Sequence, residues 1–381
     1  MNFVFLSWKD IKNPVAGGAE LVHQEISKRL VKQGHSVTHL VPGFNDCLAT
    51  EEIDGVKIHR IGSSTLYFYW LPIVFLREYR QNTDYLVDIF NCFGTVFNLF
   101  WFPSKKTIFL IHHIQDILWF RQTVFPGLPN WLVPIINFIG YFLEKIQLLI
   151  YSLFFKGKVV TVSNSTKQEL QKYGFKENKI EIISEGILGK PLGALEDIAA
   201  KEQEFTLITI GLRKMKRPEH VLEGFYKFQQ TIPNVKLWIL GWGTEGQRLV
   251  DRSKELGIED KVFFWGRVSD EKRDELLQKS SLLVTTSVKE GWGIIVLEAN
   301  ALGTPALGYN VPGLRDALNF ENGWLSKPDI NSLSSKLEEI YHIWKGNKPE
   351  YNKIRLNGLN TLKQVNFDNS TQQFLDIIKD R

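Results

Sequence analysis

Cysteine is scarce in this sequence of 381 residues, and its scarcity excludes two kinds of site. The two cysteines, Cys47 and Cys92, have neither the spacing of a metal site nor the number that a disulfide framework needs. We therefore expect a reducing, cytoplasmic environment. No basic stretch precedes the apolar run 2–7, so we predict no signal peptide. The net charge of +4 is too small to indicate a nucleic-acid partner, although it is compatible with weak attraction to anionic lipid.

A clear membrane-spanning segment is also lacking. Aromatic residues make up 13% of the chain and gather in residues 66–76, 89–102 and 131–155. The last stretch is the one candidate span, but it contains Pro134 and the Glu144-Lys145 pair, and charges are costly inside a bilayer. We therefore expect no transmembrane helix there. Either the aromatic stretches form core and crossover helices, or they dock at a membrane surface with the help of nearby basic residues. These basic residues are Arg77, Arg80, Lys105, Lys106, Lys156 and Lys158.

Two successive series of strand and helix patterns account for most of the chain. Its length exceeds a single typical core, and 44% hydrophobic against 23% charged residues indicates a folded protein. Apolar strand-like runs lie at 2–7, 36–41, 56–61, 85–90, 106–111, 158–162 and 180–183, and again at 205–211, 235–240, 262–265, 282–286 and 305–309. Helix-length segments separate many of them, which is typical of parallel sheets. Residues 189–203 have little apolar periodicity and are expected to link two α/β domains.

Two features at strand ends in the first half are candidate binding residues. Gly17 and Gly18 open a helix after the first strand, either as an entry turn or as a place where a ligand approaches the backbone. No G-x-G-x-x-G loop follows this strand, which argues against a nicotinamide dinucleotide. His112 and His113 follow the strand 106–111, at the end where open α/β sheets bind ligands. The alternative is two ordinary loop-edge histidines, and no further ligand at suitable spacing indicates zinc.

A basic loop in the second half precedes a helix. Arg213, Lys216 and Arg217 lie between the strand 205–211 and that helix. Basic side chains beside a helix start favour phosphate binding, and the alternative is a solvated charged turn. Gly313 lies at a later helix entrance and is a further phosphate candidate.

The most informative stretch pairs two glutamates around a glycine turn. Glu290 precedes Gly291-Trp292-Gly293, and Ile294 begins an apolar helix-length segment that contains Glu298. Glycine allows close approach to the backbone, a helix start attracts phosphate, and carboxylates accept hydrogen bonds from sugar hydroxyls. Because a buried carboxylate is costly without a partner, a ligand role is favoured over a solvated helix face.

Glu290 and Glu298, with seven residues between them and a strand before them, resemble the Glu-x7-Glu signature of retaining glycosyltransferase family 4. The run 162–187 is similar to the end of that family's N-terminal domain, and the run 321–325 to one of its later strands. The resemblance departs at Trp292, where the family usually has Phe, and at Glu185, where it more often has Asn. The basic loop is one residue short, so the family's arginine and lysine roles fall on Arg213 and Lys216, with Arg217 as the alternative lysine equivalent.

The resemblance implies the GT-B fold, an α/β architecture. In it two Rossmann-like domains face each other across a cleft, and a C-terminal helix returns to the first domain. For this chain it implies an N-terminal acceptor-binding domain over residues 1–188 and a nucleotide-sugar-binding domain over 204–350. Residues 351–381 are then expected to be helices that pack on the N-terminal domain.

The implied reaction moves a hexose, with retention, from a UDP- or GDP-linked sugar to a hydroxyl of a glycan or lipid-linked acceptor. Such a reaction belongs to glycan, polysaccharide or glycolipid synthesis. The implied catalytic residues are Glu290, His112 (with His113 as the alternative), Arg213 and Lys216. The implied donor-binding residues are Gly17, Gly18, Arg213, Lys216, Arg217, Gly241, Gly243, Arg267, Val268, Glu290, Gly291, Trp292, Gly293, Ile294, Glu298 and Gly313.

The implied partners are the sugar nucleotide, a hydroxyl acceptor and, if the aromatic stretches dock, the inner face of the cell membrane. The sugar nucleotide is a substrate, so no cofactor is expected, and no Asp-x-Asp sequence indicates a metal requirement. Two other classes compete with this interpretation. A non-catalytic GT-B-like binding protein would be expected to lack Glu290, Arg213 or Lys216, and a nicotinamide oxidoreductase would carry a dinucleotide fingerprint after its first strand.

Overall fold

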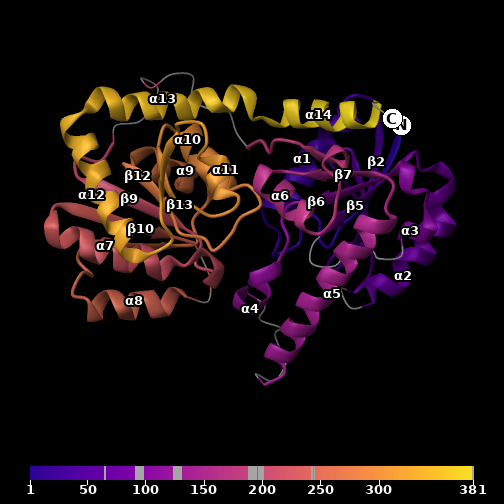
Figure 1. The fold of residues 1–381 in the computed structure, drawn as a ribbon, viewed down its shortest axis with the longest axis horizontal. Helices are drawn as coiled ribbons and strands as arrows, with labels where there is room; N and C mark the ends of the chain where they lie inside the picture. Colours follow the sequence, from indigo (N-terminus) through magenta and orange to yellow (C-terminus); the bar gives the residue numbers. More distant parts are fainter. Residues whose placement is uncertain are drawn as a thin grey trace. The chain divides into compact units, whose positions relative to one another are not determined.

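A computed structural model of the protein describes residues 1–63, 66–90, 98–122, 131–187, 195, 201–241, 243 and 245–379. The chain divides into two compact units (Figure 1). Unit 1 comprises Met1–Phe120, Phe125–Gly186 and Val365–Arg381, and unit 2 comprises Arg121–Val124 and Ile187–Gln364. The predicted linker, 189–203, lies mostly outside the described residues, as does Cys92.

Unit 1 is built on an eight-stranded sheet of order β3-β4-β2-β1-β5-β6-β7-β8. The strands are β1 Asn2–Leu6, β2 Ser36–Gly43, β3 Thr50–Ile53, β4 Val56–Ser63, β5 Tyr85–Phe90, β6 Thr107–Ile111, β7 Lys158–Thr161 and β8 Ile180–Ile182. All neighbouring strands are parallel except β3 and β4. The central strands are almost wholly buried, which explains their continuous apolar runs.

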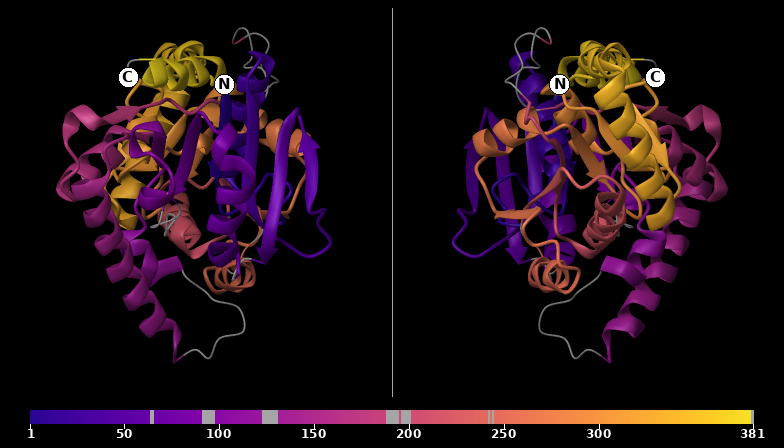
Figure 2. Two further views of the ribbon diagram at one scale, coloured as in Figure 1. Left: turned by 90° about the vertical axis from the view of Figure 1, so that its right-hand side faces the viewer. Right: turned by 90° about the vertical axis from the view of Figure 1, so that its left-hand side faces the viewer.

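Helices surround this sheet (Figures 1 and 2). They are α1 Gly18–Lys32, α2 Tyr67–Val74, the π-helical turn Phe75–Tyr79, α3 Asn98–Trp101, α4 Trp119–Gln122, α5 Val133–Phe154, α6 Asn164–Lys172 and α14 Phe367–Lys379, with short 3-10 turns at Arg80–Asn82, Ser104–Lys106, Asp116–Leu118 and Glu177–Lys179. Helix α1 buries Val22, Ile26 and Leu30, which follow the helical repeat. Helix α14 lies beside α1, and Phe374 packs against the β1 rings of Phe3 and Phe5.

Unit 2 has a six-stranded parallel sheet of order β11-β10-β9-β12-β13-β14. Its strands are β9 Phe205–Ile210, β10 Val235–Leu240, β11 Val262–Gly266, β12 Leu282–Thr285, β13 Ala306–Tyr309 and β14 Gly323–Ser326. Its helices are the 3-10 turn Lys214–Lys216, α7 Pro218–Thr231, α8 Gly246–Glu255, α9 Asp270–Lys279, α10 Ile294–Ala301, α11 Leu314–Ala317, α12 Ile330–Gly346 and α13 Lys348–Gln364. Two parallel-sheet α/β units agree with the predicted fold class.

The C-terminal segment expected at 351–381 is divided between the two units. Helix α13 belongs to unit 2, where the Tyr351 hydroxyl donates to the carbonyl of Ser281 at 2.6 Å and Gly358 packs on Asn300. Residues from Val365 onward, including α14, belong to unit 1. The resemblance implied that all of 351–381 packs on the N-terminal domain, whereas residues 351–364 belong to unit 2 and only the part from Val365 onward belongs to unit 1.

Each sheet has a topological switch point, where the next strands of the chain are added on opposite sides of one central strand. In unit 1 the chain runs from β1 to β2 on one side and later places β5 on the other side of β1. In unit 2, β9 has β10 on one side and β12 on the other. Open α/β sheets bind ligands beside the carboxyl ends of the strands at such points. The ends of β1 and β5, and those of β9 and β12, are therefore the places to search for a site.

Candidate functional site

The loop that follows β9 is fixed to the segment that follows β12. It begins at Gly211, whose φ of 99° is strained for other residues. The Thr286 hydroxyl, just after β12, lies 2.9 Å from the carbonyl oxygen of Lys216 and 2.8 Å from that of Arg217. The amide of Val288 donates to the carbonyl of Met215 at 2.8 Å. The two loops therefore form one surface at the switch point of unit 2.

Lys216 and Glu290 form the charged centre of this surface. The Lys216 Nζ donates to Glu290 Oε1 at 2.5 Å, and the Ser287 hydroxyl donates to the same oxygen at 2.5 Å. Burial alone would raise the pKa of Glu290, but Lys216, the hydrogen bond from Ser287 and the charge of Arg213 outweigh it and hold the pKa below its ordinary value. Glu290 is therefore an ionised carboxylate, and Arg213 lies exposed on the adjoining loop.

Arg217 plays a different part from its neighbour Lys216. Its guanidinium donates to the carbonyl oxygens of Thr286 and Ser287, both at 2.8 Å, and lies 4.9 Å from the ring centre of Tyr309. The side chain of Arg217 therefore ties the loop after β9, which carries it, to the backbone of the loop after β12. Of the two residues considered for the lysine role, Lys216 is the one in contact with Glu290.

The backbone of Glu290 is held by the turn that precedes α11. The Glu290 amide donates to the carbonyl of Pro312 at 3.0 Å. Gly313 has φ 82°, and a Cβ atom there would overlap the backbone oxygen of Glu290. Glycine at 313 is thus needed both for its conformation and for close packing against the carboxylate-bearing loop.

Replacement of Gly313 by alanine is expected to destabilise the protein by about 2 kcal/mol or more, because left-handed strain and the overlap with Glu290 act together. Denaturant unfolding measures the change. Gly346→Ala is the matched control, since a Cβ there has open space around it. A Gly313→Ala protein as stable as the control would contradict the packing described here.

The second glutamate of the motif lies in α10. Burial raises the pKa of Glu298, and Arg273, whose guanidinium is 3.9 Å from its carboxylate, offsets this only in part. Trp292 is buried, and its indole Nε1 has no hydrogen-bond partner in the part of the chain that the structure describes. Gly293, at φ 103°, caps α10, while Gly291 and Ile294 are half-buried beside it.

The glycines after β10 pack on the loop after β9. Gly241 has φ 110° and donates its amide to the carbonyl of Gly266 at 2.8 Å. A Cβ at Gly243 would overlap the backbone of Leu212. These glycines, with Gly246, have the G-x-G-x-x-G spacing that was noted as lacking after the first strand. Here the spacing follows a later strand and serves backbone packing. After β11, Arg267 is exposed and Val268 is half-buried.

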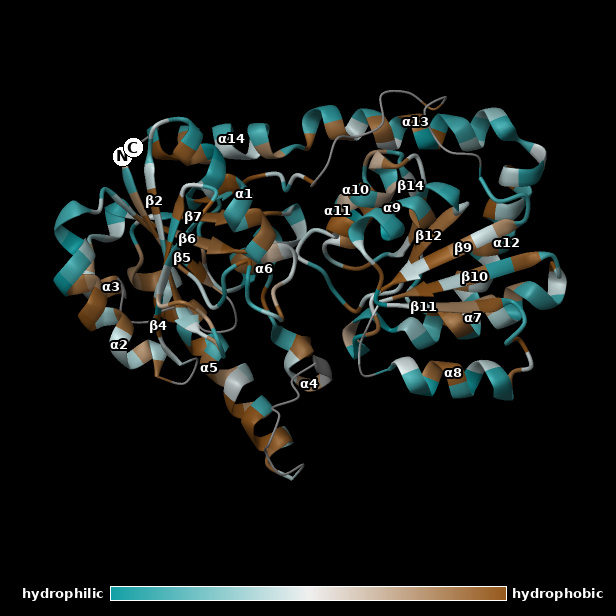
Figure 3. Ribbon diagram, turned by 180° about the vertical axis from the view of Figure 1, so that it is seen from behind, coloured by the Kyte–Doolittle hydropathy of each residue, from teal (hydrophilic) through white to brown (hydrophobic). Residues whose placement is uncertain are grey.

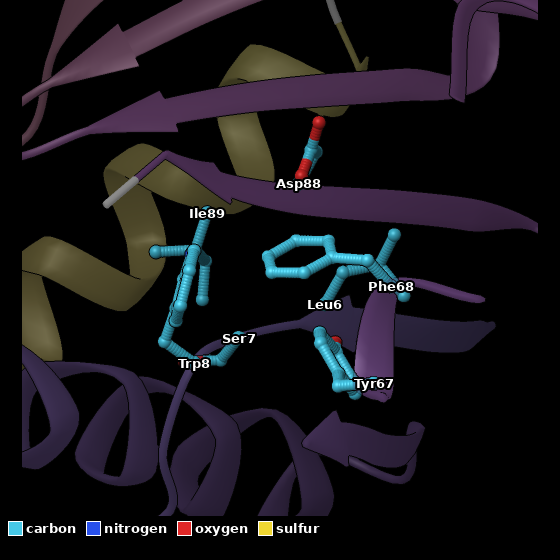
Figure 4. Close-up of a pocket in the computed structure, with 7 residues that line it drawn as sticks. All are labelled: Leu6, Ser7, Trp8, Tyr67, Phe68, Asp88 and Ile89. Atoms are coloured by element: carbon cyan, nitrogen blue, oxygen red, sulfur yellow. The ribbon is translucent and has the colours of Figure 1, made fainter. Parts of the chain in front are cut away.

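Unit 1 has a small pocket at its own switch point (Figure 4). Its walls come from the ends of β1 and β5 and from α2. The lining residues are Leu6, Ser7, Trp8, Tyr67, Phe68, Asp88 and Ile89. The rings of Trp8 and Phe68 meet edge to face with centres 4.7 Å apart, and the Tyr151 hydroxyl donates to Asp88 at 3.0 Å. The pocket thus has aromatic walls and one carboxylate.

His112 lies at the same edge of the sheet, directly after β6, in a buried row of three polar side chains. Its Nδ1 is 2.7 Å from Glu185 Oε1, and its Nε2 is 2.6 Å from the Nε2 of His23 on α1. Burial, followed by repulsion from His112 and His39, holds the pKa of His23 well below its ordinary value. The sequence did not single out His23, because a histidine inside an apolar helix pattern has no distinctive signal. His113 is half-buried and adjoins this row.

The glycine pair at 17–18 begins the helix that carries His23. Gly17 is the N-cap of α1, and its amide donates to the Glu20 carboxylate at 2.7 Å. The expected contact with a donor therefore stays a prediction for both glycines. Within the described residues, three or more His, Cys, Asp or Glu side chains are nowhere grouped as a metal site would require.

Family models match both halves of the chain. Residues 16–187 match the model described as Glycosyltransferase Family 4, and residues 195–358 match the model described as Glycosyl transferases group 1. An uncharacterized glycosyltransferase from Methanocaldococcus jannaschii is 24% identical over 363 residues, which is 90% of each chain.

Solved structures agree in fold over the whole chain. Sucrose-phosphate synthase from Thermosynechococcus elongatus has a TM-score of 0.75 at 16% identity and covers 100% of this chain and 98% of its own. HepE from Anabaena, in complex with UDP-glucose, has a TM-score of 0.69 at 18% identity, with 100% of both chains covered. With both halves matched, the chain belongs to the family 4 type of glycosyltransferases, which have the GT-B fold.

Proposed function

We propose that this glycosyltransferase moves a hexose from a UDP- or GDP-linked sugar to a hydroxyl of a glycan or lipid-linked acceptor, with retention at the anomeric carbon. The observation that carries the proposal is the Lys216–Glu290 pair beside Arg213, at the carboxyl ends of β9 and β12. A similar fold in HepE binds UDP-glucose, which supports a nucleoside diphosphate sugar as donor. The synthesis of glycans, polysaccharides or glycolipids follows from such an acceptor.

The charges of unit 2 suit the departure of a nucleoside diphosphate. Arg213 and Lys216 would neutralise the charge that develops on the leaving diphosphate, which is electrostatic stabilisation of the transition state. Amides at Gly291–Gly293, which precede α10, would add to it. No metal has a role in this proposal, because the sequence has no Asp-x-Asp placed to hold one.

The two glutamates of unit 2 have separate roles in the proposal. Glu290, ionised and beside Lys216, would accept hydrogen bonds from hydroxyls of the transferred sugar. Glu298, with its raised pKa, would accept hydrogen bonds from the ribose. The turns at Gly241–Gly243 and Arg267–Val268 would border the base.

Unit 1 would bind the acceptor and contact the sugar. His112 would contact the transferred sugar near its reacting carbon. No side chain is assigned as a covalent nucleophile, and the leaving phosphate would accept the proton of the acceptor hydroxyl.

A panel of UDP-, GDP- and ADP-sugars and nicotinamide cofactors tests the donor by thermal stabilisation. At ten times its Kd, the true donor stabilises the folded state by ~1.4 kcal/mol. The melting temperature should then rise by roughly 3–5 °C. The Lys216→Ala protein should lose most of this shift. Stabilisation by a nicotinamide cofactor alone would contradict the proposal.

Product analysis then separates an enzyme from a sugar-nucleotide-binding protein. With acceptor present, release of nucleoside diphosphate should continue in excess EDTA, and the anomeric coupling in the NMR spectrum of the product should match that of the donor. Binding without release would support the non-catalytic alternative, and an inverted anomeric centre would contradict retention.

A further inference from the structure

Helix α5 has its polar face inward and its apolar face outward. The buried residues of this 22-residue helix are Asn137, Gly140, Glu144, Gln147, Leu148 and Tyr151. Glu144 is fully buried and accepts hydrogen bonds from the amides of Gln115 and Asp116, at 2.8 and 2.9 Å, and from the indole of Trp119 at 3.0 Å. In a water-exposed helix of a globular protein the distribution is the opposite.

The outward face of α5 is entirely apolar. Each residue of an α-helix is turned by about 100° from the one before it. Seven large side chains, spaced by one, three or four positions, therefore lie on the side of the helix opposite Glu144. Each of them is about half exposed or more. These residues are Ile135, Phe138, Ile139, Phe142, Ile146, Leu149 and Leu153. We call them the α5 outer face. Trp131, just before the helix, is 68% exposed and adds an amphipathic ring at its end.

Among the described residues of unit 1, none covers this face of α5. Figure 2 shows the helix reaching away from the sheet toward its N-terminal end, and Figure 3 shows that this part is predominantly hydrophobic. A contiguous exposed face made of seven large apolar side chains marks an interaction surface.

The exposed charges on α5 and directly after it are positive. Lys145 lies on the helix and Lys156 follows it, while the carboxylate of Glu144 is buried on the inner side. Lys158, further on, is paired with Glu181 at 2.6 Å and does not add to this charge. An apolar face bordered by cations matches a surface of anionic lipid. A second copy of the same chain would bring the same cations against one another, which disfavours it as the occupant.

We propose that α5 docks the protein on an anionic lipid bilayer, with the helix lying in the interface and its outer face in the acyl boundary. By length and composition Val133–Phe154 could also cross a membrane. However, its inner face is occupied by protein: Glu144 has its three donors there, and Gly140 is packed so closely on the ring of Trp119 that no Cβ would fit. A spanning helix would have to break these contacts. This proposal does not depend on which sugar is transferred.

Co-sedimentation with vesicles tests the proposal on the full-length protein. Vesicles of phosphatidylcholine with 30% phosphatidylglycerol, roughly a bacterial or cytoplasmic leaflet charge, should bind the protein at low salt, and pure phosphatidylcholine should bind it more weakly. The Phe142→Glu/Ile146→Glu protein should lose at least about tenfold in partitioning, because two charges then enter the acyl boundary. Its melting temperature should not change, since both side chains are exposed in the free protein.

The matched control is Phe263→Glu/Leu356→Glu, which changes two similarly exposed apolar residues of unit 2. Equal loss of binding in the control, or no binding of the native protein to anionic vesicles, would overturn the proposal. Bound protein that resists an alkaline carbonate wash would overturn the interfacial placement in favour of a span. A native dimer that the α5 variant converts to monomer, with vesicle binding unchanged, would assign the face to a second copy.

Discussion

Replacement of Lys216 by alanine is expected to lower kcat/KM by about 10²–10³-fold while the protein stays folded. Two effects add. The leaving diphosphate loses a cation, and the carboxylate of Glu290 loses the partner that lies 2.5 Å from it. The second effect raises the pKa of Glu290 toward its ordinary range, because burial is then opposed only by Ser287 and the more exposed Arg213.

The measurement is steady-state release of nucleoside diphosphate with the donor found by the panel, after circular dichroism has shown that each variant is folded. Lys214→Ala is the control, since Lys214 lies in the same 3-10 turn, carries the same charge and is exposed. The control should retain nearly full activity.

Glu290→Gln and Arg213→Ala extend this test. If Lys216 and Glu290 act as one unit, the Lys216→Ala/Glu290→Gln protein should lose much less than the product of the two single losses. Full transfer activity in folded Lys216→Ala, Arg213→Ala and Glu290→Gln proteins would sink the assignment of this surface as the donor site.

The strand pattern of both units could be predicted from the sequence because parallel strands are buried on both faces. Runs such as 106–111 and 205–211 are apolar without interruption, and they appear in the structure as β6 and β9 with shifts of one residue. The family signature at Glu290 and Glu298 then gave the fold class, which the family models and solved structures confirm.

The strand 56–61 was predicted and is β4, but β3 and the turn that joins it to β4 were missed although the turn has a clear signal. Asp54 and Gly55 adopt φ 54° and 80°, the pattern of a tight turn that favours Asp-Gly. The strand before it, Thr50–Ile53, contains two glutamates and is half-exposed, so it lacks the apolar run by which the other strands were found. In a sequence, a half-exposed edge strand of this kind is recognised by the Asp-Gly turn that follows it.

The orientation of α5 could not be predicted because hydropathy does not say which face meets protein. The sequence between 131 and 155 was compatible with a core helix or with docking. Only the structure places Glu144 inward, against Trp119, and the run of Ile, Leu and Phe outward. Glu144, one of the residues that argued against a span, is the one that holds the helix on unit 1 through Gln115, Asp116 and Trp119.

The row of His23, His112 and Glu185 was hidden for a similar reason. Its members are far apart in sequence, and Glu185 was noted only as a departure from the asparagine more usual in the family. In the structure this departure has a partner, since Glu185 lies 2.7 Å from His112 Nδ1. Contacts at long sequence separation follow from the fold and not from local pattern.

Replacement of Glu185 by leucine is expected to lower kcat by about ten- to hundredfold with little change in the donor KM. The reason is that His112 then loses its buried, charge-assisted hydrogen bond to Glu185. Glu185 accepts the Nδ1 proton of His112, which leaves a single proton between the two Nε2 atoms of His112 and His23. Glu185 is thus a positioning residue: it fixes which nitrogen of His112 carries hydrogen, and the proposed function assigns that side chain a contact with the sugar.

The tautomer of His112 can be measured directly, and it would not change if Glu185 had only a structural role. Two-dimensional ¹⁵N spectra of the imidazoles should show hydrogen on Nδ1 in the native protein and a mixture of forms in Glu185→Leu. Glu185→Gln keeps an acceptor oxygen at the same length and should restore the tautomer and part of the rate. Glu181→Gln, on the neighbouring β8 and paired with Lys158 at 2.6 Å, is the control and should change neither. A shifted tautomer with native kcat would remove His112 from the chemistry, because a residue that contacts the reacting sugar cannot exchange its donor for an acceptor without altering the rate.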